Sequence, residues 1–293
     1  MTGRRRGLRA SGELAAELSH PRWTLRKLIE RSLAQLHAET AELDLPGRCE
    51  VCRAWSSFRV DNEGGGGVET GVWRPNWRER LVCASCGLNC RQRALASRLL
   101  AAVGEGSGRL YLMERVTPLH ARLSEALGTD RVVGSEYLGP DRRPGEVVNG
   151  IRHEDAERLS FGDGSFGAVG SADVLEHVND PAAVLAEVRR VLEPGGVFWF
   201  SVPFYADRER SVRRAERIGG ETVHHLPPEI HGDPLLAGGT LVMTDFGWDL
   251  MDELRTAGFA DCWGELYWDL EAAYLGIGHL LFAALSTTRQ PSR

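Results

Sequence analysis

The sequence contains no long hydrophobic run. Its longest apolar stretch, Leu275 to Leu285, is broken by two glycines and a histidine, and it is shorter than the roughly 20 residues that a membrane-spanning helix needs. Basic residues open the chain, but no apolar segment of signal-peptide length follows them. We therefore expect a soluble, cytoplasmic protein without a membrane partner.

A concentrated basic surface is also missing from the sequence. The net charge is −6; residues 1–98 carry 17 Lys and Arg against 11 Asp and Glu, and the remaining residues carry 18 against 30. A basic front part is compatible with binding to nucleic acid or to an acidic partner. Its arginines are interspersed with acids, however, and the larger part of the chain is acidic. A small-molecule or carrier-bound substrate is therefore favoured over nucleic acid.

Cysteine is nearly absent outside one segment. Five of the six cysteines fall within 42 residues, and four of them form two C-x2-C pairs, Cys49 with Cys52 and Cys83 with Cys86. Four thiolates complete the tetrahedral shell of a structural zinc ion and leave no open position for catalysis. A reducing compartment favours zinc over disulfides. The pairs predict a structural Zn²⁺ site; the alternatives are inert buried thiols or a catalytic C-x2-C pair, and Cys90 is a spare ligand or a packing residue.

The segment between the two cysteine pairs is predicted to form a β-hairpin. A glycine-rich turn, Asp61 to Gly67, separates Trp55 to Val60 from Val68 to Trp73. Glycine supplies the positive φ angles that a tight reversal needs. Before this module, Leu14 to Leu43 has the apolar spacing of a helix.

The rest of the chain alternates between predicted strands and helices, a pattern typical of a parallel, doubly wound α/β sheet. No helix separates the last two strands, so these are expected to pair antiparallel. The expected domains are a helical segment (1–47), a zinc-ribbon-like module (48–98) and the α/β domain (99–293). The predicted strands are 109–113, 131–136, 150–153, 167–174, 197–202, 259–268 and 277–285, and the predicted helices are 91–103, 118–127, 181–192 and 246–257.

Three segments of the α/β region carry a family resemblance. They are DAERLSFGDGSF from Asp155, SADVLEHV from Ser171 and LEPGG from Leu192. Together they resemble the type 11 group of class I S-adenosylmethionine (SAM)-dependent methyltransferases. The resemblance covers roughly residues 105–286. It implies a Rossmann-like, seven-stranded class I sheet with SAM as cofactor.

The resemblance also implies contacts to SAM. Glu136, at the end of the second strand, would accept hydrogen bonds from both ribose hydroxyls. Tyr137 or Leu138 would lie against adenine, and Asp155, together with the Ala156 amide, would bind the adenine edge. The alternatives are a solvated strand-end acid for Glu136 and a turn cap for Asp155.

The first turn departs from the family pattern because it contains no glycine. Residues 113–118 read MERVTP, where the family carries a glycine-rich turn. Glu114, Arg115 and Thr117 are the candidates for SAM contact in this turn. The helix that begins at Pro118 points backbone amides into the crevice, and Arg115 is expected to pair with the SAM carboxylate.

Methyl transfer needs a nucleophile held in line with the methyl group and, for an alcohol or amine, a nearby base. The resemblance places the end of the fourth strand beside that methyl group. This nominates Asp173, Glu176 and His177. His177 is either the base or a residue that orders the turn.

A proline-rich loop, HHLPPEIHGDP from His224, provides other candidates. Proline-stiffened loops hold side chains in place, so His225 or His231 is an alternative general base in a substrate lid. A second interpretation is a metal site made by His224, His231 and Asp233. A third is a lid ordered only by its own hydrogen bonds.

These observations predict a SAM-dependent O- or N-methyltransferase acting on a small molecule or a carrier-bound metabolite. The alternatives are an RNA methyltransferase with a zinc ribbon, or a methyltransferase-fold protein that has lost methyl transfer and acts as a binding module or repurposed enzyme. The sequence predicts neither the acceptor nor the oligomeric state.

Overall fold

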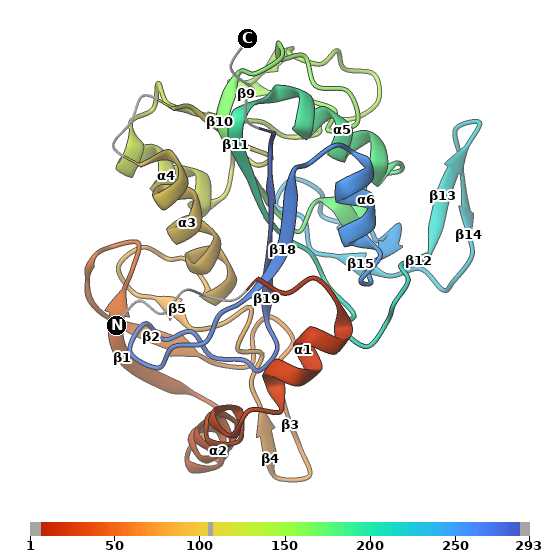
Figure 1. Ribbon diagram of the computed structural model, residues 1–293. Coiled ribbons are helices and arrows are strands. Elements are labelled where there is room, and N and C mark those ends of the chain that lie inside the picture. Colours follow the sequence, from red (N-terminus) through yellow and green to blue (C-terminus); the bar gives the residue numbers. More distant parts are fainter. Residues whose placement is uncertain (1–6, 105–107, 288–293) are drawn as a thin grey trace. The chain divides into compact units, whose positions relative to one another are not determined.

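The computed structural model describes residues 7–104 and 108–287, which form two compact units (Figure 1). The first unit comprises residues 7–8, 12–98 and 265–281, and the second comprises residues 9–11, 99–264 and 282–287. The late segment 265–281 thus belongs with the front of the chain. Residues 1–6, which include Arg4, Arg5 and Arg6, and residues 105–107 lie outside the described residues. No helix within the described ranges is both long and apolar enough to cross a membrane.

The predicted helix from Leu14 to Leu43 is wrong in its extent. The chain forms α1 (Ser11–Leu18) and α2 (Pro21–Leu36), and residue 43 already begins a strand. His20 caps α2 by accepting a hydrogen bond from the Arg22 amide, and Pro21 occupies the first turn of α2. Proline is favoured at a helix start because its missing N–H would have no partner there.

The predicted hairpin across the glycine turn is also wrong. β2 (Ala54–Val60) pairs antiparallel with β1 (Leu43–Cys49) on one side and with β5 (Val82–Cys83) on the other. The glycines lead instead to a separate hairpin of β3 (Gly67–Glu69) and β4 (Val72–Arg74). Its two-residue turn, Thr70 and Gly71, has positive φ at both positions, as tight hairpins require.

The second unit contains a six-stranded sheet in the order β18-β19-β11-β10-β6-β7. β7, β6, β10 and β11 run parallel, and β19 pairs antiparallel with β11. The hydrogen bonds Ala260 N to Leu285 O and Tyr267 N to His279 O bracket an antiparallel β18–β19 pair, as expected. The strands are β6 (Leu110–Leu112), β7 (Val132–Gly134), β10 (Phe166–Ala172), β11 (Leu192–Ser201), β18 (Asp261–Leu266) and β19 (Leu280–Leu285).

The helices α4 and α5 of this unit begin at the residues that the sequence predicts. Thr117 caps α4 (Pro118–Leu127), and Asp180 caps α5 (Pro181–Val191) by accepting from two amides. Because parallel crossovers are right-handed, α4 and α5 cover opposite faces of the sheet (Figure 1). α3 (Cys90–Val103) precedes the sheet, and α6 (Leu250–Thr256) precedes β18. The last helix is therefore shorter than the expected 246–257, and Phe246 instead makes a parallel bridge with Phe204.

The sheet has six strands among the described residues rather than the expected seven. The expected third strand, 150–153, is part of a small hairpin of β8 (Val147–Val148) and β9 (Ile151–Arg152). The segment after this hairpin is joined to the segment after β7 by a single parallel bridge, Glu136 to His153. The α/β class and the parallel core are nevertheless confirmed.

The insertion between β11 and α6 is built from short antiparallel pairs. A 3₁₀ turn, η1 (Leu175–His177), follows β10 and contacts β17. The pairs are β12 (Val212–Arg213) with β17 (Thr244–Asp245), β13 (Ala215–Ile218) with β14 (Glu221–His224), and β15 (Ile230–His231) with β16 (Thr240–Leu241).

Candidate functional site

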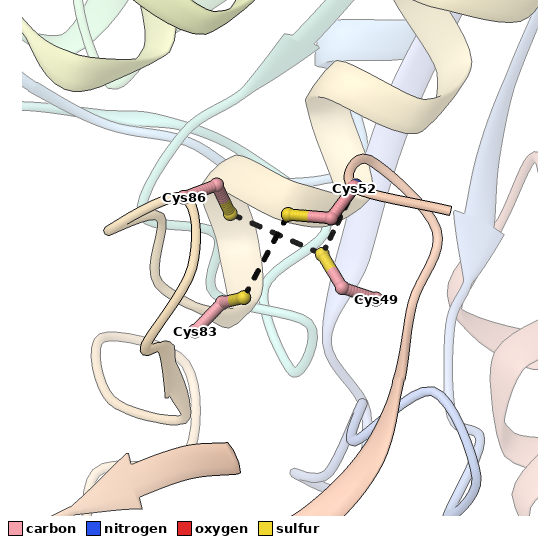
Figure 2. A group of neighbouring side chains, drawn as sticks. All are labelled: Cys49, Cys52, Cys83 and Cys86. Atoms are coloured by element: carbon pink, nitrogen blue, oxygen red, sulfur yellow. Dashed lines mark hydrogen bonds between the residues drawn. The ribbon is translucent and has the colours of Figure 1, made fainter. Parts of the chain in front are cut away.

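The four predicted zinc ligands converge in the first unit (Figure 2). One sulfur lies at the end of β1 and one in the following turn, while the other two lie at β5 and in the turn after it. The Cys49 and Cys86 sulfurs are 3.9 Å apart, and those of Cys52 and Cys83 are 4.0 Å apart. Four sulfurs held about 2.3 Å from one zinc ion would be about 3.8 Å apart. The spacing fits a tetrahedral ion.

The other two cysteines lie apart from this cluster. Cys90 is buried at the start of α3, where its sulfur lies 3.8 Å from the Leu275 carbonyl oxygen. Burial raises the pKa of the Cys90 thiol to about 11. The role of a packing residue fits this environment, and a thiol so resistant to ionisation is a poor spare ligand. Cys262 is buried in β18.

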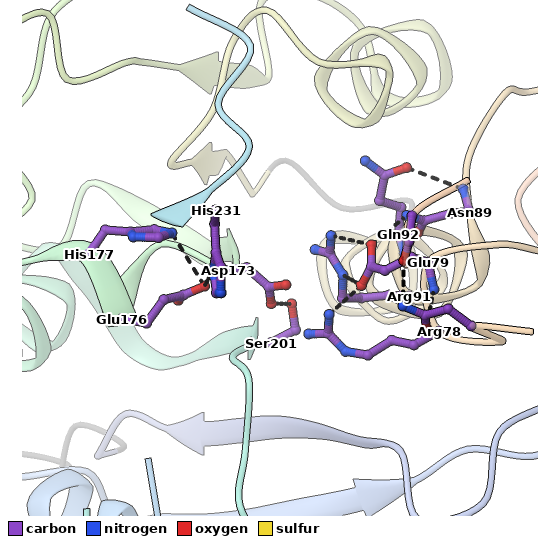
Figure 3. Close-up of polar contacts among 12 residues, drawn as sticks. Arg78, Glu79, Asn89, Arg91, Gln92, Asp173, Glu176, His177, Ser201 and His231 are labelled. Atoms are coloured by element: carbon purple, nitrogen blue, oxygen red, sulfur yellow. Dashed lines mark hydrogen bonds and ion pairs between the residues drawn. The ribbon is translucent and has the colours of Figure 1, made fainter. Parts of the chain in front are cut away.

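A polar cluster holds the residues on either side of Cys83 and Cys86 together (Figure 3). Glu79 accepts two hydrogen bonds of 3.0 Å from Arg91 and one of 3.0 Å from Asn89. Asn89 and Gln92 also exchange backbone-to-side-chain hydrogen bonds. The first turn of α3 is thereby tied to the chain that enters β5.

In the second unit, Glu136 lies just beyond the carboxyl end of β7 and closes the glycine-free turn. Its Oε1 accepts hydrogen bonds from the amides of Arg115, at 2.6 Å, and Val116, at 2.9 Å. Burial raises the pKa of Glu136, while these two amides oppose the rise. One carboxylate oxygen therefore positions the turn, and the other is not needed for that task.

The first two side chains of the glycine-free turn are buried. Met113 and Glu114 are 7% and 8% exposed, so their side chains point into the protein. The Arg115 guanidinium lies 3.3 Å from Nδ1 of His120, and Thr117 caps α4. Arg115 is thus directed toward α4, and the backbone amides rather than the side chains of this turn face Glu136.

The candidate adenine contacts follow in the next connection. Tyr137 is 48% exposed, and its ring lies 5.5 Å from that of His153. Asp155 Oδ1 accepts a hydrogen bond of 3.0 Å from the Glu157 amide, which is the turn-cap role that the sequence left open. Ala156 lies within this turn.

Asp173 occupies the carboxyl end of β10 in a strained conformation. Its φ is +56°, in the left-handed region that a non-glycine residue rarely adopts. Ser201, at the end of β11, donates a hydrogen bond of 2.7 Å to Asp173 Oδ1. Such strain is concentrated at functional sites, which supports the choice of Asp173.

Glu176, His177 and His231 form a compact cluster beside Asp173 (Figure 3). Glu176 Oε1 lies 3.6 Å from His177 Nε2 and 3.7 Å from His231 Nδ1. The two imidazole rings are perpendicular, with centroids 5.2 Å apart. Burial raises the pKa of Glu176, the neighbouring His231 opposes the rise, and the charge of Asp173 adds to it.

The proline-rich loop is divided between two places. His231 joins Glu176, whereas His225 pairs at 2.9 Å with Glu216 on a partly exposed hairpin. The alternative metal set of His224, His231 and Asp233 is wrong: His224 ends the exposed strand β14, and Asp233 caps its own turn through the Leu235 and Leu236 amides. The sequence predicts a place for Glu176 at the end of the fourth strand, but it does not predict the pairing of Glu176 with His231, because that contact joins residues distant in the chain.

Comparison with family models now identifies this unit. Residues 99–200 match the type 11 model described as "Methyltransferase domain". Residues 99–200 are thus similar to a type 11 methyltransferase domain. The match covers β6 to β11, with Glu136, Asp155, Asp173, Glu176 and His177 inside it. The resemblance seen in the sequence is confirmed, and the sheet has the class I methyltransferase fold.

Curated relatives match part of the chain. A dimethylglycine N-methyltransferase of Parasynechococcus marenigrum is 47% identical over 107 residues, covering 36% of this chain and 36% of its own length. A ubiquinone biosynthesis O-methyltransferase of Methylococcus capsulatus is 35% identical over 112 residues, covering 37% and 44%. The chain therefore spans less than half the length of either relative. A solved SAM-dependent methyltransferase of Mesorhizobium loti is 21% identical, covers 65% of this chain and 97% of its own, and has a TM-score of 0.41.

Proposed function

We propose that the protein is a SAM-dependent O- or N-methyltransferase acting on a small molecule or a carrier-bound metabolite. The observation that carries this proposal is the set of acids at the carboxyl edge of the methyltransferase domain. Glu136 follows β7, and Asp173 follows β10 in a left-handed conformation. Ligands of open α/β sheets bind at this edge.

The residues at this edge fit SAM. Glu136 is a half-buried carboxylate whose pKa is raised by burial, and the amides of Val116 and Arg115 and the charge of Arg115 oppose that rise. Two ribose hydroxyls would add donors to the same carboxylate and reduce its desolvation cost. Asp155, Ala156 and Tyr137 would then border the adenine, and Arg115 and Thr117 would border the methionine part.

SAM supplies a methyl group bound to a positively charged sulfur, which a nucleophile displaces in line. Asp173 and Ser201 lie on adjacent strands and would orient the acceptor beside that methyl group. Asp173 lies beside the cluster of Glu176, His177 and His231, whereas His225 lies on a separate hairpin, so we place activation of the acceptor at this cluster and not at His225. The relatives named above act on small molecules by their names, which favours an acceptor of that class.

We also propose that Cys49, Cys52, Cys83 and Cys86 hold one structural Zn²⁺. Their sulfur spacing fits a tetrahedral ion. The ion would fix the ends of β1 and β5 relative to each other. With four thiolate ligands it would have no free position for an acceptor.

Calorimetric titration of SAM and of S-adenosylhomocysteine tests the cofactor site. We expect micromolar binding to the zinc-loaded protein and at least tenfold weaker binding to Glu136→Gln. Glutamine keeps one oxygen for the turn amides but loses the second acceptor. The control Glu216→Gln, in the exposed hairpin with His225, should bind both ligands normally.

If neither ligand binds the unaltered protein, the glycine-free turn has closed the site and the proposed methyl transfer is wrong. Equal binding by Glu136→Gln and the unaltered protein would instead remove Glu136 from the cofactor site.

A further inference from the structure

Glu176 is a buried acid that faces two histidine rings at longer than hydrogen-bond distance. The residue is 0% exposed, and among the described residues neither of its carboxylate oxygens has a hydrogen-bond partner. A buried carboxylate without donors is costly. Two histidine nitrogens face it at 3.6 and 3.7 Å, distances longer than a hydrogen bond.

The two histidines are oriented by their other nitrogens. His177 Nδ1 lies 2.9 Å from the Leu241 carbonyl oxygen and must donate to it. His231 Nε2 lies 3.3 Å from Glu229 Oε1 and donates there. In the neutral state of each ring, the nitrogen that faces Glu176 then carries a lone pair. Metal-binding histidines are held in the same way, with the distal N–H bonded to a carbonyl or a carboxylate.

From this arrangement we propose that Glu176, His177 and His231 bind one divalent transition-metal cation (Figure 3). The three ligand atoms lie within 4.8 Å of one another. Ligands held at about 2.0–2.2 Å from a metal would be roughly 3.0–3.4 Å apart, so closure around an ion needs only small side-chain shifts. Two imidazoles and one carboxylate select ions such as Zn²⁺, Fe²⁺ or Mn²⁺ over Ca²⁺ and Mg²⁺.

Two elements contribute ligands to this site. Glu176 and His177 come from η1 directly after β10, and His231 comes from β15 in the insertion. The backbone amide of Met243 donates to the Glu176 carbonyl at 2.6 Å, which ties the insertion to η1. An ion would therefore fix the β15–β16 hairpin against the end of the methyltransferase domain.

Three protein ligands leave coordination positions open for another molecule. The proposed acceptor binds at Asp173, and the cluster lies beside Asp173. If the proposed methyl transfer is correct, the open coordination positions therefore lie close to the acceptor. The acceptor class would then carry an oxygen donor, a hydroxyl or a carboxylate, that binds the ion. This last step rests on the proposed function, whereas the metal site does not.

Mn²⁺ binding to the intact chain, loaded with only the one equivalent of zinc that the four cysteines take, tests the site, because excess Zn²⁺ would occupy it more tightly than Mn²⁺. Mn²⁺ prefers nitrogen and oxygen ligands to thiolates, so the cysteine cluster does not compete for it. Electron paramagnetic resonance of free Mn²⁺ should show one equivalent bound per chain. Binding should weaken at least tenfold in His231→Ala and in Glu176→Gln, and it should be unchanged in the matched control His225→Ala, which removes a neighbouring His–Glu pair.

The alternative outcomes are distinct. Absence of Mn²⁺ binding, or equal binding by His231→Ala and the unaltered protein, would overturn the proposal. His231 is 30% exposed, so this variant should fold even if Glu176→Gln does not. Glu136→Gln should keep Mn²⁺ while losing SAM, so failure of the metal site and failure of the cofactor site are separable.

Discussion

His120 is a base buried on the inner side of α4. Its Nδ1 lies 3.3 Å from the Arg115 guanidinium and 3.4 Å from Ser124 Oγ. A Cβ at Gly134 would lie 2.3 Å from its ring, so glycine at this point of β7 is what allows the ring to fit. Burial, followed by the charge of Arg115, lowers the pKa of His120 from 6.5 to about 4.

This residue should make stability depend on pH. The unfolded chain binds a proton to His120 below pH 6.5, and the folded chain does so only below about pH 4. The contribution of neutral His120 to the free energy of unfolding is therefore fully present above its unfolded pKa, and it is lost as the pH falls from 6.5 toward 4. Between pH 7 and pH 5 we expect His120 to account for a loss of about 2 kcal/mol in the free energy of unfolding.

Urea denaturation at both pH values measures this loss. The His120→Gln variant should lose less stability between pH 7 and pH 5 than the unaltered protein. Ser124→Ala removes a neighbouring hydroxyl but no titrating group, so it should keep the full pH dependence. An identical pH dependence in His120→Gln and the unaltered protein would show that His120 is not the group responsible.

At the scale of elements, local sequence signals located the parallel core well. Thr117-Pro118 and Asp180-Pro181 mark helix starts, and the structure begins α4 and α5 there. The hairpin between the cysteine pairs failed because strand pairing is not a local property. β2 pairs with β1 and β5. The strand β1 directly follows a segment with helical spacing, so its sequence did not indicate a strand.

The cysteine cluster makes a prediction at this same scale. Cys49→Ser and Cys86→Ser should each lower the zinc content by one equivalent, because three thiolates cannot complete the shell. Each should also lower the thermal stability, since metal binding contributes directly to folding in small zinc modules. Elemental analysis and thermal unfolding measure both effects. Cys90→Ser should keep the full zinc content, and loss of zinc in that variant would make Cys90 a ligand.

At the scale of the whole molecule, the first unit is completed by a segment from the far end of the sequence. Arg93 is 0% exposed, and its guanidinium donates hydrogen bonds to the carbonyls of Leu81, Ala272 and Ala273. The same group lies 4.2 Å from the Phe58 ring and 4.7 Å from the Tyr274 ring. The sequence of residues 265–281 does not indicate that this segment contacts Arg93. In the same way, no local pattern indicates that His231 contacts Glu176. The sequence could therefore predict which strand ends carry functional acids, but not these distant contacts.

A fragment of residues 1–103 should consequently fail to fold. Without residues 265–281 the Arg93 guanidinium loses two of its three carbonyl acceptors and one aromatic neighbour, which leaves a buried charge insufficiently paired. Circular dichroism should show no cooperative thermal transition for the fragment, even with one equivalent of zinc. A sharp transition would mean that the late segment is dispensable.

The interleaving of the two units also bears on how the protein is made. Domains generally fold as they leave the ribosome, with the N-terminal one first. Here the first unit needs residues 265–281, and the sheet of the second unit needs β19, which ends at residue 285. Neither unit can be completed until residue 285 has been translated, so the cysteine-rich segment must remain incompletely packed until that point.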